Sequence, residues 1–212
     1  MTPGRAWSFG EELAHSLTHG AGLAASVAGL VVLVVLAARS GDPWRIVACT
    51  VFASTVVLLY AASTLYHALS RTRARGLFRV LDHSAIFLLI AGTYTPFALV
   101  TLRGPWGWTL FGIVWALAAV GIIVKAVFGT RWPVFSTGLY IGMGWTAVIA
   151  AKPLAAAVAP GCLAWLLAGG LAYTGGVVFY AWVRLRYSHA IWHVFVVAGT
   201  ICHYVAVARY VV

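Results

Sequence analysis

Long apolar segments alternate with short polar breaks along almost the whole chain. Seven of these segments are each close to the roughly 20 residues that a helix needs to cross the hydrocarbon core of a bilayer. Their expected limits are residues 16–38, 46–69, 81–102, 106–126, 134–151, 161–183 and 189–209. The breaks between them are short, so neighbouring helices should pack antiparallel in one bundle. The pattern predicts an all-α fold, with residues 1–212 forming a single domain of seven transmembrane helices.

The amino-acid composition supports a membrane location. Hydrophobic residues make up 63% of the 212 residues and charged residues 8%, whereas a soluble domain is about 25% charged. The mean hydropathy is +0.96. These values exclude a soluble globular protein. Glycines at helical spacing, Gly138 with Gly142 and the pairs in GGLAYTGG, indicate close packing between helices.

Basic residues outnumber acidic ones, and the formal net charge is +10. The basic residues lie in short clusters between the apolar segments, so no nucleic-acid partner is expected. Seven spans place nine of the 14 Lys and Arg residues on one side of the membrane: Arg5, Arg71, Arg73, Arg75, Arg79, Lys125, Arg131, Arg184 and Arg186. The opposite side receives Arg39, Arg45, Arg103, Lys152 and Arg209. By the positive-inside rule the N-terminus is cytoplasmic and the C-terminus lies outside the cell membrane.

Two histidines stand four residues apart at the start of the last apolar segment, in the sequence SHAIWHVF. On an α-helix, positions i and i+4 lie about 40° apart around the axis and roughly 6 Å apart along it. His189 and His193 therefore project side by side from one face, a spacing that suits two ligands of one metal ion. Histidines that only form hydrogen bonds within a helix bundle can share this spacing, so a metal site requires further residues to converge here.

Two other stretches place polar side chains at the same cytoplasmic face. ASTLYHALSR closes the second span with Ser63 and His67, and FRVLDHSAIF opens the third with Asp82 and His83. At a rise of 1.5 Å per residue, these side chains and the histidines of the last span lie roughly 5 to 10 Å below one membrane boundary. The sequence therefore predicts that the three stretches meet.

Three neutral imidazoles that leave one position open are typical of a catalytic zinc centre, whereas structural zinc is usually closed by four ligands and rich in cysteine. We therefore predict zinc as the cofactor, with His67, His189 and His193 as its ligands. Ser63, one turn before His67, and Asp82 should face the open position. There Asp82 could orient a water molecule or accept its proton, because zinc makes such a water more acidic.

Four residues of the chain are acidic. Glu11 and Glu12 are expected to precede the first span and Asp42 to lie in a loop, which leaves Asp82 as the only acid inside a span. An ionisable group within the membrane is by default a candidate for function, because an unpaired charge is unfavourable there. This argument adds weight to a role for Asp82 beside the metal.

The first polar stretch, EELAHSLTHG, offers rivals for the ligand roles. His15 and His19 form another i, i+4 pair at the cytoplasmic face. Glu12, together with Thr18 and His19, fits a network that supports the ligands from behind.

Three other side chains have alternative interpretations. His83 points about 100° away from Asp82, and His203 lies roughly 15 Å deeper than His193, so both histidines are excluded from the ligand set. The Ser63 hydroxyl could instead bond a backbone carbonyl of its own helix, as serine often does in membrane spans.

Four blocks of the sequence resemble one known family. EELAHSLTHG, STLYH, FRVLDHSAIFLLIAGTYTPF and SHAIWHVFVVAG are similar to the bacterial haemolysin III proteins of the progestin and adiponectin receptor superfamily. The resemblance implies a seven-helix membrane fold with a cytoplasmic N-terminus and an intramembrane zinc ion bound by three histidines. Matched block by block, it implies His67, His189 and His193 as ligands, with Ser63 and Asp82 beside the metal. The family usually has asparagine where this chain has an additional histidine at position 15, so a contact around the metal is altered or an extra ligand is available.

Three functions are compatible with these features. The open metal position, the adjacent carboxylate and the relation to membrane ceramidases that the resemblance implies favour a zinc-dependent hydrolase of a lipid amide or ester. Its partner is then a membrane lipid bound as substrate. The alternative is a non-enzymatic membrane sensor or receptor in membrane homeostasis, with a lipid ligand and zinc that staples the second, third and seventh spans. A cytolysin (haemolysin) is disfavoured, because the spans offer no polar stripe that could line a pore. The sequence does not indicate the oligomeric state.

Overall fold

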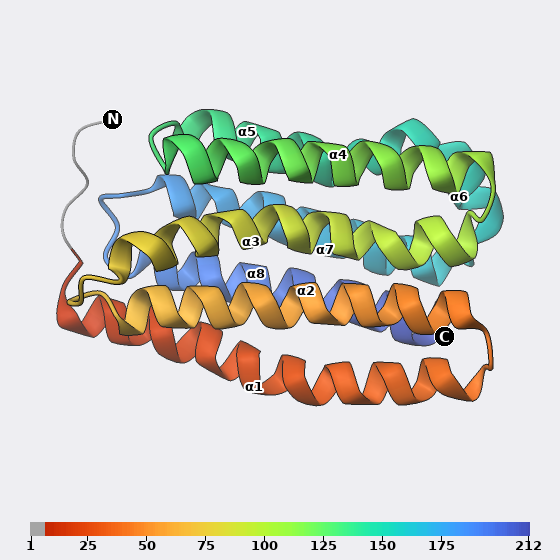
Figure 1. Cartoon of the computed structure of the whole chain (residues 1–212), viewed down its shortest axis with the longest axis horizontal. Coiled ribbons are helices and arrows are strands. Elements are labelled where there is room, and N and C mark those ends of the chain that lie inside the picture. Colours follow the sequence, from red (N-terminus) through yellow and green to blue (C-terminus); the bar gives the residue numbers. More distant parts are fainter. Residues whose placement is uncertain (1–6) are drawn as a thin grey trace.

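The spans form a helical bundle in which successive spans run antiparallel to each other (Figure 1). The computed structural model describes residues 7–212. In that range the helices are α1 (Phe9–Arg39), α2 (Pro43–Ala68), α3 (Arg75–Pro96), η1 (Phe97–Thr101), α4 (Pro105–Phe128), α5 (Pro133–Gly144), η2 (Thr146–Ala150), α6 (Ala151–Ala157), α7 (Pro160–Ala181) and α8 (Ser188–Tyr210). The predicted all-α class is confirmed, and seven helical stretches are long and apolar enough to cross a membrane.

Helix α1 begins earlier than predicted. It starts at Phe9 because Ser8 caps it: the Ser8 hydroxyl accepts a hydrogen bond from the Glu11 N–H at 3.3 Å, and the Glu11 carboxylate accepts one from the Ser8 N–H at 2.9 Å. This reciprocal capping box satisfies two N–H groups at the helix start. Glu11 and Glu12 therefore lie inside the helix, where they are 2% and 8% exposed. The expectation that Asp82 is the only acid inside a span is wrong.

Two of the spans are not continuous α-helices. The third passes from α3 into the π-helical turn η1 directly after Pro96, which has no backbone N–H to donate. The fifth is interrupted at Trp145, between α5 and the 3-10 turn η2. At this interruption the Tyr94 hydroxyl donates to the Gly144 carbonyl at 2.7 Å and accepts from the Ala147 N–H at 2.8 Å. Backbone groups near the interruption are thus paired within the protein, as an apolar environment requires.

Three clusters of buried apolar side chains hold the bundle together, and two of them are the largest. One lies between α1, α2 and α8 and includes Leu33, Phe52 and Val207, which are all 0% exposed. The other joins α3 and α5 to α4 and includes Phe87 and Met143. Large apolar side chains also point outward from all seven spans. Such an apolar exterior suits a bundle that is surrounded by lipid.

The predicted close packing at glycines is confirmed in α7 and wrong in α5. Helices α7 and α8 lie so close that a Cβ atom on Gly176 would be 2.6 Å from the Cβ of Phe195. A Cβ on Gly138 or Gly142 would meet no atom of the described residues within 4 Å, apart from its own helix and chain neighbours. Small residues therefore set the distance between α7 and α8, whereas the glycines of α5 do not serve close packing.

Gly176→Ala should destabilise the protein by about 1 to 3 kcal/mol, because the added methyl group must displace Phe195 or Trp192. Gly138→Ala is the matched control. It should be neutral or stabilise α5 by up to about 1 kcal/mol, since alanine favours a helix more than glycine does. Thermal unfolding of both variants in detergent measures the difference, and equal losses of stability would contradict the observed α7–α8 packing.

The start of α1 and the end of α8 lie at opposite ends of the bundle (Figure 1), as an odd number of spans requires. The charge distribution then predicts that the loop between α2 and α3, with Arg71 and Arg73, is cytoplasmic. Arg5, which was counted on the same side, lies outside the described residues. A reporter inserted in this loop should be cytoplasmic, and one fused after Val212 should not. Accessibility of both reporters from one side would contradict the orientation and the span count.

Candidate metal centre

The three predicted ligands meet at the end of the bundle where α2 ends and α8 begins. His67 lies in the last turn of α2, and His189 and His193 lie in the first two turns of α8. One ligand atom from each ring lies within 4.8 Å of those of the other two. The ring centroids are 4.6 to 5.3 Å apart. The structure thus brings together two parts of the chain that are far apart in the sequence.

His67 is held by a buried carboxylate from α1. Its Nδ1 donates to Glu12 Oε2 at 2.8 Å, since a carboxylate can only accept. Arg75 donates to the other oxygen of Glu12, Oε1, at 3.1 Å. The second ring nitrogen of His67, Nε2, is buried and has no hydrogen-bond partner among residues 7–212. A carboxylate that fixes one ring nitrogen and leaves the other free is the usual arrangement around a metal-binding histidine.

His193 is oriented in a similar way by α1. Its Nδ1 lies 3.2 Å from the backbone oxygen of His15 and 3.1 Å from the Thr18 hydroxyl. The carbonyl can only accept, so we assign the proton to Nδ1. The Thr18 hydroxyl itself donates to carbonyls of its own helix. His193 therefore keeps a lone pair on Nε2, as His67 does.

Trp7 covers the cluster. Its ring centroid lies 4.7 Å from that of His189, 4.8 Å from that of His15 and 5.3 Å from that of His67. The indole ring thus shields the imidazoles on one side. Its position in the sequence does not indicate this contact, because a tryptophan close to the end of a span is typical of an interfacial anchor.

These residues fit a transition-metal ion. Neutral imidazoles are good ligands for zinc and for other first-row transition metals. A buried ring nitrogen without a partner, as at His67 Nε2, is uncommon and indicates that the site is built for a ligand. Three protein ligands also leave a coordination position free for chemistry.

Ser63 and Asp82 lie on the cavity side of the cluster. Both line the same cavity as His189 and His193. The Ser63 hydroxyl also pairs with His19 Nδ1 at 2.7 Å, so it contacts a side chain of α1. Asp82 belongs to neither set of described residues whose ligand atoms lie within 4.8 Å of one another. Its position therefore suits a role beside a metal ion and not a ligand role.

The two rival histidines of α1 also face the cluster. His19 stacks on His193, with 3.5 Å between the ring centroids, and the His15 ring lies 4.7 Å from that of His67. Neither belongs to the three-histidine set, but His15 forms a second set with Glu12 and His67. The supporting network expected on α1 is present. Glu12 is hydrogen-bonded to His67. Thr18 pairs with His193, and His19 pairs with Ser63.

The two histidines that were excluded from the ligand set lie outside the cluster, although both line the same cavity. His83 donates through Nδ1 to the Arg79 carbonyl at 2.8 Å, and its own carbonyl accepts from the Tyr140 hydroxyl at 2.7 Å. His203 stacks on Tyr173 with 5.5 Å between ring centroids. Neither residue appears in a set of described residues with metal-ligand spacing.

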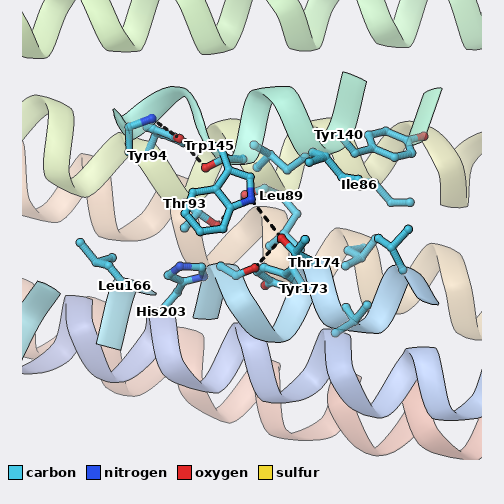
Figure 2. A pocket seen from close by; sticks show the side chains of 18 of the residues that line it. Ile86, Leu89, Thr93, Tyr94, Tyr140, Trp145, Leu166, Tyr173, Thr174 and His203 are labelled. Carbon is cyan, nitrogen blue, oxygen red and sulfur yellow. Dashed lines mark hydrogen bonds between the residues drawn. The ribbon is translucent and has the colours of Figure 1, made fainter. Parts of the chain in front are cut away.

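A cavity of about 480 Å³ extends from the cluster into the bundle. Its polar end includes Ser63 and Asp82, and most of its remaining wall is apolar and comes from α3, α5, α7 and α8. Figure 2 shows its inner part, where Trp145 donates to Thr174 at 3.0 Å and His203 faces the same space. The volume is in the range of ligand-binding cavities. A long apolar space with one polar end suits an amphipathic molecule.

Known proteins are similar to this chain along nearly its whole length. A family model described as haemolysin-III related matches residues 7–204. Hemolysin-3 of Bacillus cereus is 46% identical over 201 residues, which cover 95% of this chain and 92% of that protein. The Hemolysin-3 homolog of Bacillus subtilis (strain 168) is 43% identical over 202 residues, or 95% of each chain.

A more distant similarity reaches animal proteins. The monocyte to macrophage differentiation factor of Homo sapiens is 26% identical over 206 residues, which cover 94% of this chain and 84% of that protein. This relative supports the wider progestin and adiponectin receptor superfamily that the sequence motifs indicated. With its seven apolar helices and these matches, the chain belongs to the haemolysin-III-related family of multi-pass membrane proteins.

Proposed function

We propose that this protein is a zinc-dependent hydrolase that cleaves a lipid amide or ester within the membrane, with zinc bound by His67, His189 and His193. The observation that supports this most directly is the place of the histidine cluster, at the polar end of a largely apolar cavity and beside the buried carboxyl group of Asp82. Metal-binding nitrogens, a candidate base and space for an acyl chain are therefore adjacent.

Zinc, when bound, supplies Lewis-acid chemistry, which polarises a carbonyl group and makes a nearby water more acidic. Asp82 would accept a proton from the attacking water, whose oxygen adds to the carbonyl carbon. It would then return that proton to the leaving amine or alcohol as the C–N or C–O bond breaks. Ser63, which pairs with His19 and lines the same cavity as Asp82, would orient the carboxyl group. The apolar cavity wall would hold the acyl chain and keep bulk water away.

A membrane sensor or receptor is the second candidate function. Its support is the connectivity of the cluster: a metal ion held by His67 and His193 would link α2 to α8, and both helices pack on α1. In this case a lipid in the cavity is a ligand and not a substrate. Occupancy by metal or lipid would then change the packing of the bundle without turnover.

The three-histidine site of the purified protein should hold about one tightly bound zinc ion per chain. His67→Ala, His189→Ala or His193→Ala should each weaken zinc binding roughly tenfold or more, because two ligands hold the ion far less well than three. Elemental analysis after extensive dialysis measures the retained zinc. His203→Ala is the control and should retain it. Loss of zinc in His15→Ala and His19→Ala, with retention in His189→Ala, would show that the other histidine pair binds the metal.

Asp82→Asn should retain zinc and reduce hydrolysis roughly 100-fold or more, because the amide preserves size but cannot accept the proton. Ser63→Ala should reduce hydrolysis less, by at most about 3 kcal/mol in activation free energy. Release of fatty acid from ceramide and phospholipid, in detergent and in bilayers, measures the rates, with zinc content and melting temperature recorded beside them.

The same measurements separate the two candidate functions. If Asp82 only balances the charge of the cation, Asp82→Asn should lower zinc content and melting temperature together. A wild-type protein that binds these lipids but hydrolyses none of them would favour the sensor.

A further inference from the structure

We propose a second cation-binding position, formed by Glu12, His15 and His67 and adjacent to the three-histidine cluster. One ligand atom of each residue lies within 4.8 Å of those of the other two, and all three side chains are buried. This position differs from the first in using two residues of α1 in place of the two histidines of α8. It does not depend on whether the protein hydrolyses a lipid.

His15 is the residue that most clearly lacks a partner. It is 0% exposed, and neither its Nδ1 nor its Nε2 has a hydrogen-bond partner among residues 7–212. An imidazole always presents at least one N–H donor, and buried polar atoms are nearly always paired. An unpartnered imidazole at the centre of a polar cluster therefore indicates a ligand that residues 7–212 do not supply.

Glu12 is placed to share that ligand. Its Oε2 atom lies 3.7 Å from Nδ1 of His15, which is too far for a direct hydrogen bond. Two ligands that are each about 2.0 Å from a tetrahedral ion lie about 3.3 Å from each other. The separation of these two atoms is therefore closer to that of two ligands of one ion than to that of a hydrogen-bonded pair.

His67 can serve both positions because its two ring nitrogens face different neighbours. Nδ1 donates to Glu12 at 2.8 Å, and Nε2, which has no hydrogen-bond partner among residues 7–212, is available to the three-histidine set. A cation at the second position would replace the Nδ1–H···Oε2 hydrogen bond, and the Nδ1 proton would leave to solvent. The imidazolate of His67 and the carboxylate of Glu12 then bring two negative charges to a divalent ion, while Arg75 keeps its bond to the other carboxylate oxygen.

The chemistry of this set selects the class of ion. Two imidazole nitrogens and one carboxylate oxygen suit a divalent transition metal such as zinc or cobalt. Calcium and magnesium prefer oxygen ligands and are not expected. Trp7, whose ring centroid lies 4.8 Å from that of His15 and 5.3 Å from that of His67, shields the position and so limits competition from water.

Cobalt binding to the full-length protein in detergent tests this proposal. After removal of bound metal with a chelator, equilibrium dialysis against Co²⁺ should give about two ions per chain for the wild type. His15→Asn should bind about one, His193→Ala about one, and His67→Ala none, because only His67 belongs to both sets. The visible absorption of the second cobalt ion should be missing from His15→Asn.

His203→Asn is the matched control. His203 is also a buried histidine with an unpartnered ring nitrogen, Nδ1, but it belongs to neither set of described residues. This variant should bind cobalt as the wild type does. His15→Gln, which keeps a longer polar side chain, repeats the test with a second variant, and size-exclusion chromatography verifies that each protein is folded and monodisperse.

The outcomes separate this proposal from the proposed function. The second position would be overturned if the wild type and His15→Asn each bound one ion and His193→Ala bound none. The three-histidine site would then remain supported, and His15 would contact only a water molecule. Two ions in both the wild type and His15→Asn would also overturn it. One ion that persists in His193→Ala and is lost in His15→Asn would support the Glu12 set and contradict the metal site of the proposed function.

Discussion

The buried carboxylate of Glu12 connects three helices at the end of the bundle that contains the site. Its backbone belongs to α1, its Oε2 accepts from His67 of α2, and its Oε1 accepts from Arg75 of α3. A carboxylate in an apolar environment is stable only while such partners are in place. The same contacts determine which nitrogen of His67 is free. Helix association and the orientation of the His67 ring therefore depend on the same carboxylate.

Helix α1 contributes no member of the three-histidine set, yet its hydrogen bonds orient two of the three histidines. It supplies the carboxylate for His67 and the carbonyl of His15 for His193, and it holds Ser63 through His19. The cavity in front of the set has one polar end and mostly apolar walls. An enzyme and a lipid sensor would both need this combination. What would distinguish them is whether a group beside a bound metal ion accepts a proton. Our candidate for that group is the carboxyl group of Asp82, which lines the same cavity.

The sequence by itself determined the number of spans and the membrane class, because bilayer thickness prescribes the length of each apolar segment. It also determined that His189 and His193 project together, because that relation depends only on the geometry of one helix. The start of α1 could have been found too, since Ser8 and Glu11 have the spacing of a capping box. It was missed because an apolar-segment criterion stops at the first charged residues, and Glu12 was consequently placed outside the span.

Only the tertiary structure decided which side chains of different helices meet. Three features depend on how far α1 is rotated about its axis relative to α2 and α8: the pairing of Glu12 with His67, the cover by Trp7, and the lack of a hydrogen-bond partner for the His15 ring among residues 7–212. Gly138 in α5 is a second example. It has the helical spacing of the α7 glycines, but a Cβ atom on it would meet no atom of another helix within 4 Å among the described residues. Helical periodicity relates residues within one helix, whereas rotation between helices results from the packing of all side chains in the bundle at once.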